Sequence, residues 1–164
     1  MRLLFRKIIL KIATFFPMSG LWRGRLNKLG GVKIADIKKI SIGDGTILDT
    51  LNPEGIILDK WVTITMKCVI LSHYYDTSKR GRVWKYGTVH LKEGAFLGAG
   101  VLVCSPVTIG KWSIVGAGSV VTKSIPDYEI WAGNPAKFIK VRPGYEKEHS
   151  EALDNVLNDS SCVS

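Results

Sequence analysis

Aliphatic residues recur at every sixth position along the second half of the chain. From residue 91 to residue 126 the sequence divides into the blocks LKEGAF, LGAGVL, VCSPVT, IGKWSI, VGAGSV and VTKSIP, and every block opens with an aliphatic residue. The fifth position of each block is small or aliphatic, and positions two to four are rich in glycine and polar residues. A period of six excludes an α-helix, whose apolar positions recur every three or four residues. It also excludes an ordinary antiparallel sheet and indicates short strands joined by similar turns.

The same phase is present upstream, with breaks. Ile42 and Leu48 open two blocks, and the period restarts at Leu58 with LDKWVT, ITMKCV and ILSHYY. Three such strands form one triangular coil, and stacked coils place the aliphatic residues in ladders that fill a prism. The sequence therefore predicts an all-β parallel β-helix, with a loop over 74–88 extruded where the ladder is interrupted. A conventional β-sandwich with glycine turns is the alternative.

The first sixteen residues predict an amphipathic helix. Arg2, Arg6, Lys7 and Lys11 interrupt the apolar run, so it is too polar for a transmembrane span, and it lacks the cleavage site of a signal peptide. Wound as a helix, the segment gathers Lys7, Lys11 and Thr14 on one side, and on another side Leu4, Ile8, Ile12 and Phe15. This apolar face either packs on the end of the prism as a cap or lies on a membrane surface.

Three segments are thus expected: an N-terminal helical segment over 1–30, a β-helix domain over 31–142 and a polar C-terminal tail or short helix over 143–164.

The formal charge of +9 suits an anionic partner, which is a phosphorylated ligand, an anionic membrane or nucleic acid, although general solubility explains it too. The three cysteines lack C-x-x-C spacing, which argues against a disulfide framework or zinc site. A reducing compartment follows, so we expect a cytoplasmic protein, peripheral at the inner membrane face if the helix binds lipid.

The stretch VTIGKWSIVGAGSVVTKSIPDYEIWAGNPAKFIK, residues 107–140, resembles the hexapeptide-repeat acyltransferases, which include galactoside, maltose and serine acetyltransferases. The resemblance covers residues 40–142. It is greatest to the galactoside/maltose branch and its relatives that acetylate bacterial polysaccharides. It implies a left-handed β-helix, a homotrimer, acetyl-CoA as co-substrate, no metal, and direct transfer of an acetyl group to a hydroxyl.

His73 is the candidate catalytic residue, since it stands where the family places its catalytic histidine, before the extruded loop. A sugar hydroxyl is a poor nucleophile at neutral pH, and histidine titrates near the pH at which a base must take its proton. Outside this resemblance, His73 reads as a polar turn residue. His90 is a weaker candidate on a re-entering strand, and His149 is expected to be solvated.

The resemblance also implies the binding residues. The backbone at Gly98 and Ala99 matches the family's donors to the thioester oxygen. Residues that match its contacts to coenzyme A are Ala99, Ala117, Thr122, Lys123, Lys137 and Lys140. Trp131 departs from the smaller residues usual before A-G-N-P. On the acceptor side, Asp49 replaces an asparagine that touches the sugar in galactoside and maltose enzymes. The loop adds Tyr74, Asp76, Arg82 and Trp84, which either contact the acceptor or pack the loop.

We therefore expect an acetyl-CoA-dependent O-acetyltransferase that acts on a sugar or polysaccharide precursor. Zinc-dependent carbonic anhydrases share the prism but need three histidine ligands, and Ala95 stands where a third would be needed. A non-catalytic scaffold or binding module and an antibiotic-modifying acetyltransferase remain alternatives. A nucleic-acid binder would rest on charge alone, because no recognisable motif is present.

Overall fold

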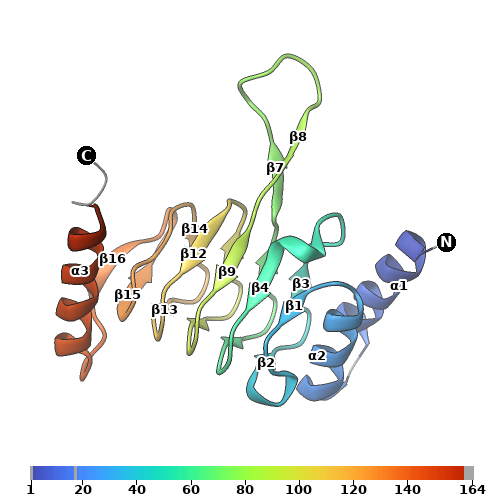
Figure 1. Ribbon diagram of the computed structural model, residues 1–164. Helices are drawn as coiled ribbons and strands as arrows, with labels where there is room; N and C mark the ends of the chain where they lie inside the picture. The colour runs from blue at the N-terminus through green and yellow to red at the C-terminus, as the bar shows by residue number, and fades with distance from the viewer. Residues whose placement is uncertain (1, 17, 161–164) are drawn as a thin grey trace.

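The computed structural model describes residues 2–16 and 18–160, and these form a prism of stacked coils with helices at both ends (Figure 1). Helices α1 (Arg2–Phe15) and α2 (Gly20–Leu29) lie at one end, and α3 (Glu146–Ser160) lies at the other. Two short 3₁₀ helices, η1 (Ile37–Lys39) and η2 (Pro53–Gly55), sit in turns of the first coils.

Three parallel sheets form the sides of the prism, and the chain visits them in rotation. The first sheet contains β1 (Lys33–Ile34), β4 (Ile56–Leu58), β9 (Val89–Leu91) and β12 (Val107–Ile109). The second contains β2 (Ser41–Ile42), β5 (Thr63–Ile64), β10 (Phe96–Leu97), β13 (Ile114–Val115) and β15 (Glu129–Ala132), with β16 (Lys137–Val141) added antiparallel at its edge. The third contains β3 (Ile47–Leu48), β6 (Val69–Ile70), β11 (Leu102–Val103) and β14 (Val120–Val121).

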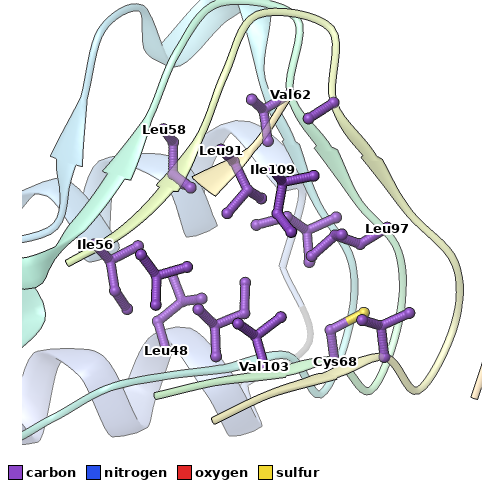
Figure 2. Close-up of a cluster of buried hydrophobic side chains, with 14 of the residues drawn as sticks. Leu48, Ile56, Leu58, Val62, Cys68, Leu91, Leu97, Val103 and Ile109 are labelled. Atoms are coloured by element: carbon purple, nitrogen blue, oxygen red, sulfur yellow. The ribbon is translucent and has the colours of Figure 1, made fainter. Parts of the chain in front are cut away.

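The register of the sheets confirms the six-residue period. Leu97 pairs with Val115 and Val103 with Val121, so a coil without an inserted loop is eighteen residues, or three blocks. Every block-opening aliphatic residue from Ile42 to Val121 is buried, because it is the last residue of its strand and faces inward. Figure 2 shows these side chains converging on the axis of the prism. Those labelled are Leu48, Ile56, Leu58, Val62, Cys68, Leu91, Leu97, Val103 and Ile109.

The fifth positions of the blocks occupy the inner corners, as the pattern predicts. Ala95, Val101 and Ser113 are fully buried there, and the Ser113 hydroxyl donates to the carbonyl of Gly110, so it is satisfied within its own turn. The turns need left-handed backbone at Gly100 and Gly118, with φ of +70° and +69°, which glycine adopts without steric cost.

The N-terminal helices cover the open end of the prism, but the face that packs differs from the face expected. Ile9, Leu10 and Ala13 are buried, whereas Leu4, Ile8, Ile12 and Phe15 are exposed. Two contacts fix this rotation of α1. Leu10 packs directly over the backbone of Gly30, where a Cβ would lie 2.5 Å from Leu10 Cδ2. The buried guanidinium of Arg23 donates to the carbonyls of Ala13 and Ile42, at 3.0 and 2.9 Å.

The extruded loop is more regular than the sequence suggests. It contains an antiparallel hairpin of β7 (His73–Tyr75) and β8 (Trp84–Tyr86), which projects from one side of the prism (Figure 1). In the C-terminal segment, expected as a tail or a short helix, residues 146–160 form α3. His149 of α3 is not freely solvated, because its Nε2 lies 2.9 Å from the carboxylate of Glu129.

Candidate functional site

His73 lies where the chain leaves the prism, at the first residue of β7. Its Nδ1 is 2.6 Å from Oδ2 of Asp49, which follows β3 in the preceding coil. The imidazole also makes an edge-to-face contact with the ring of Trp84 from the hairpin, with centroids 5.3 Å apart. Within the described residues, Nε2 of His73 has no hydrogen-bond partner. One nitrogen is therefore held by a carboxylate, and the other remains available.

The carboxylate of Asp49 is enclosed and well supplied with hydrogen bonds. Oδ1 accepts from the backbone N–H groups of Leu51 and Asn52, and Oδ2 accepts from the N–H of Ser72, at 2.8, 3.2 and 2.8 Å. Burial raises the pKa of Asp49, but the hydrogen bonds from His73 and from these backbone groups outweigh burial and hold that pKa below its ordinary value of 3.8. Asp49 is thus ionised at neutral pH.

An ionised carboxylate can only accept hydrogen bonds. Nδ1 of His73 must therefore carry the proton in the short contact with Asp49. In the neutral imidazole this leaves the lone pair on Nε2, which is the state that a general base requires. The role of Asp49 differs from the one expected, because its side chain is fully buried and faces His73 rather than a position open to an acceptor.

Asn52 and Ser72 brace this pair, and sequence reasoning missed both. The amide of Asn52 donates to the carbonyls of Ser72 and Gly87, at 3.3 and 3.1 Å, and so joins the coil to the returning strand of the hairpin. The Ser72 hydroxyl lies 2.6 Å from the Asn52 carbonyl and 3.1 Å from Asp49. An Asp followed three residues later by Asn is a local signal for a turn that bonds its own backbone. The contact with Gly87 has no such signal.

The hairpin residues expected to bind the acceptor divide into two groups. Trp84 is half-exposed beside His73, and Tyr74 is partly buried near Gly87. Arg82 is exposed nearer the tip. Asp76, in contrast, is buried: its carboxylate accepts from the backbone and hydroxyl of Ser78, contacts which lower its pKa, and it pairs with Lys85 at 3.1 Å. Asp76 therefore closes the hairpin loop instead of facing an acceptor.

Two stacked turns between the second and third sheets hold the residues expected near the thioester; we term them the glycine corner, residues 98–100 and 116–118. The N–H of Gly98 is already used, because it donates to the carbonyl of Val115 at 2.8 Å. Among the described residues, the N–H groups of Ala99 and Ala117 have no partner, and both residues are exposed. The turns pack so closely that a Cβ on Gly98 would lie 2.5 Å from the Ala117 nitrogen. Of the predicted pair, only Ala99 keeps a free backbone donor.

The other residues expected to contact coenzyme A are exposed but lie apart. Lys137 and Lys140 are on β16, opposite Ala132 and Ile130 of β15. The strand passes near the glycine corner, because Ala136 donates to the carbonyl of Val120. Thr122 and Lys123 follow β14, and so lie at the next corner of the prism, between the third and first sheets.

His73 and the glycine corner lie at opposite ends of the third sheet. The N–H of Gly100 donates to the carbonyl of Met66, and from Met66 the chain runs through β6 before it reaches His73. Met66 and Lys67 form the corner turn itself, and the chain from Cys68 to His73, five residues further on, spans at most roughly 17 Å. A single chain therefore separates its candidate base from its candidate oxyanion donor by about the width of one side of the prism.

Residues 88–123 match the profile of the bacterial transferase hexapeptide family, which consists of six repeats. The three parallel sheets, with one six-residue block for each side of the prism, are the structure that such a repeat forms. Residues 88–123 of this chain therefore carry the hexapeptide repeat of that family. Serine acetyltransferase 2 of Arabidopsis thaliana is 33% identical over 121 residues, which cover 73% of this chain and 35% of that protein. The hexapeptide-repeat chain thus spans about a third of the length of this curated relative.

Two solved structures show the same fold. A maltose O-acetyltransferase from Clostridium difficile 630 superposes with a TM-score of 0.61 at 21% identity, over 86% of each chain. An N-acyltransferase from Bacillus cereus, AntD, solved with dTDP and 3-hydroxybutyryl-CoA, superposes with a TM-score of 0.56 at 22% identity, over 80% of this chain and 86% of that one.

A second histidine–carboxylate pair lies on another side of the hexapeptide-repeat prism. His90, on the outer face of β9, has its Nε2 3.0 Å from Asp59. Both side chains are about one-third exposed, and among the described residues the aspartate lacks the backbone donors that surround Asp49. In residues 2–16 and 18–160, no group of three or more His, Cys, Asp and Glu side chains is placed to hold a metal ion. The enclosure of Asp49 is what distinguishes His73 from His90.

Proposed function

We propose that this chain is an acetyl-CoA-dependent O-acetyltransferase on a left-handed β-helix, which transfers an acetyl group to a hydroxyl of a sugar or polysaccharide precursor. The observation that carries the proposal is the contact of 2.6 Å between the buried, ionised Asp49 and Nδ1 of His73. It leaves the lone pair on Nε2, where a hydroxyl proton can be accepted. The acetyltransferase and N-acyltransferase names among the relatives support the reaction class.

In the proposed mechanism, Nε2 of His73 takes the proton of the acceptor hydroxyl as its oxygen attacks the thioester carbonyl. The new C–O bond replaces the C–S bond, and the imidazolium of His73 returns the proton to the departing thiolate. Asp49 stabilises the imidazolium and keeps the ring in one orientation. No acyl-enzyme is needed, because both substrates are held together. The free N–H of Ala99 from a neighbouring subunit is the proposed donor to the oxyanion.

The acceptor side of the site is proposed to be the hairpin, with Trp84 as its principal surface. Its indole is half-exposed and adjoins the imidazole of His73. The indole has an apolar face and a polar N–H group, and a sugar has apolar C–H groups that can stack on such a face and hydroxyls that can accept from the N–H. Tyr86, which is exposed and pairs with His73 across the hairpin, extends this surface.

A homotrimer completes the proposed site. Since His73 and Ala99 lie about one prism side apart within a chain, the hairpin of one subunit must meet the glycine corner of a neighbour for base and oxyanion donor to act on one bond. A symmetric ring of three copies repeats that contact three times and leaves no open end. Lys137, beside the glycine corner, is then placed to bind a phosphate of coenzyme A as a point charge.

The test is release of the coenzyme A thiol from acetyl-CoA, measured against sugars, nucleotide sugars, lipid-linked sugars and hydroxyl-bearing antibiotics. The proposal predicts release that depends on one of the carbohydrate classes, with mass spectrometry showing an acetyl ester on the acceptor. If only an antibiotic supported turnover, the acceptor would be an antibiotic and the carbohydrate part of the proposal would be wrong. The absence of acetyl-CoA binding by calorimetry would favour the scaffold alternative and contradict the proposal.

Mixed oligomers test whether the site is shared between subunits. His73→Ala removes the base, and Ala117→Trp fills the exposed glycine corner, so each variant alone should be inactive. Co-assembled chains should regain activity, because some sites then combine an intact hairpin with an intact corner. A monomeric mass by light scattering, together with full activity of the unaltered chain, would contradict the trimer.

A further inference from the structure

The outer face of α1 is an apolar stripe that nothing in the chain covers. Its members, Leu4, Phe5, Ile8, Ile12, Phe15 and Phe16, are between 41% and 76% exposed. At 3.6 residues per turn they occupy one side of the helix, while Ile9, Leu10 and Ala13 on the opposite side cap the prism. The cap and the exposed stripe are therefore separate faces of one helix, and packing on the prism does not account for the stripe.

The segment that carries this stripe is strongly basic, and lysines lie along one edge of the stripe. Residues 1–39 hold ten of the 23 Lys and Arg residues but one of the 14 acidic residues, so this segment carries the whole formal charge of +9. On the helical wheel, Lys7 and Lys11 border the stripe along one edge. Arg6 and Arg23 are used internally, in pairs with Glu54 and Asp44, whereas Lys11 is exposed. An apolar stripe edged by lysines matches the interface of an anionic bilayer, where acyl chains and negative headgroups adjoin.

We propose that α1 docks this protein on the surface of an anionic lipid membrane, with the stripe in the interfacial layer and Lys7 and Lys11 at the headgroups. Charge argues against the other occupants. A second copy of α1 would bring two strongly basic segments together, and nucleic acid would leave the apolar stripe in water. No described helix is long and apolar enough to cross a membrane, so the contact is peripheral.

Docking through α1 would also position the candidate site. The guanidinium of Arg6 joins α1 to Glu54 at 2.8 Å and to the carbonyl of Gly30 at 3.1 Å. Glu54 lies in η2, directly after Asn52, which braces the Asp49–His73 pair. The lipid-facing helix is thus in direct contact with the loop that holds the base. Such a link suits an acceptor carried by a lipid at the membrane surface.

The experiment is co-sedimentation of the full chain with vesicles of phosphatidylcholine alone, or of phosphatidylcholine mixed with phosphatidylglycerol. We expect binding to the mixed vesicles that weakens with added salt. Lys7→Gln with Lys11→Gln should weaken partitioning about thirtyfold, since each basic residue at an anionic surface contributes about 1 kcal/mol. Ile8→Gln should weaken it about tenfold through lost apolar burial.

Matched controls carry the same changes elsewhere. Lys60→Gln with Lys147→Gln removes two exposed charges, and Leu153→Gln replaces an aliphatic residue about as exposed as Ile8; both controls should partition like the unaltered chain. If the control variants lost as much partitioning to vesicles as the α1 variants, net charge or general hydrophobicity would explain the binding and the proposal would be overturned. Failure of the unaltered chain to bind the mixed vesicles at low salt would also overturn it. The readout is binding and not turnover, so either result leaves the acyltransferase proposal to its own test.

Discussion

The carboxylate of Asp49 lies 2.6 Å from Nδ1 of His73, although 24 positions separate the two residues in the chain. Two consecutive coils bring them together, because β3 and β6 pair in register and each residue follows its strand. The aspartate is enclosed, while the imidazole keeps a second nitrogen without a partner in the described chain. This arrangement defines the tautomer of His73 and gives the site its proposed chemistry.

Asp49→Asn tests the positioning role of the carboxylate. An amide can present its NH₂ group to Nδ1, which would shift the ring proton to Nε2 and remove the lone pair needed there. We expect kcat to fall by about two to four orders of magnitude, with the KM for acetyl-CoA little changed. Nitrogen NMR of the His73 ring should report the change of tautomer, which a purely structural role would not produce.

Asp59→Asn is the matched control, because it alters the partner of His90, which is about one-third exposed, by the same substitution. It should leave turnover near that of the unaltered chain. Turnover of Asp49→Asn as high as that of this control, in a variant that folds normally, would remove Asp49 from the mechanism.

Asp49 should also make stability depend on acidity. Its pKa is lower in the folded chain than its ordinary value of 3.8, so the folded state holds the proton less tightly than the unfolded state. The resulting stabilisation is fully present well above that value and is lost as the pH falls below it. Denaturant unfolding at fixed protein concentration, from about pH 6 to about pH 3, should show a steeper acid loss for the unaltered chain than for Asp49→Asn. If the free energy of unfolding fell with pH equally in the two proteins, Asp49 would not be ionised in the folded chain.

Lys137→Ala with Lys140→Ala should weaken acetyl-CoA binding. Both lysines are exposed on β16, so their attraction for phosphates is screened by salt, and the variant should show a higher KM that depends less on ionic strength. Lys60→Ala with Lys147→Ala removes the same charge and should leave the KM unchanged. If the 3′-phosphate is the contact, coenzyme A should lose more affinity than dephospho-coenzyme A. An equal loss of affinity for both ligands would mean that the two lysines do not contact the 3′-phosphate.

The sequence predicts the ladder well because the same physical requirement is repeated in every block. Leu91, Leu97 and Val103 each pack in the interior of the prism. A single block that departed from the pattern would leave the six-residue period recognisable. The role of Asp49 was missed for the opposite reason. It depends on how one irregular loop, residues 49–55, folds its backbone N–H groups around a single carboxylate, and that requirement occurs once.

The sequence also left open which face of α1 packs on the prism. Its most apolar stripe could have faced the prism or a membrane, but a small residue, Ala13, faces the prism, since Arg23 donates to its carbonyl. Helical periodicity identifies which residues share a face. It does not say which face has a partner, because that depends on Gly30 and Arg23, which lie in another helix and its cap.

The most direct test of the account is the turnover of His73→Ala, measured as coenzyme A release at saturating acetyl-CoA with acetyl-CoA affinity measured in parallel by calorimetry. The account predicts a loss of about two to four orders of magnitude in kcat with affinity little changed, while His90→Ala remains near the unaltered rate. Near-normal turnover of His73→Ala in a correctly folded protein would contradict the general-base role and the proposed reaction with it.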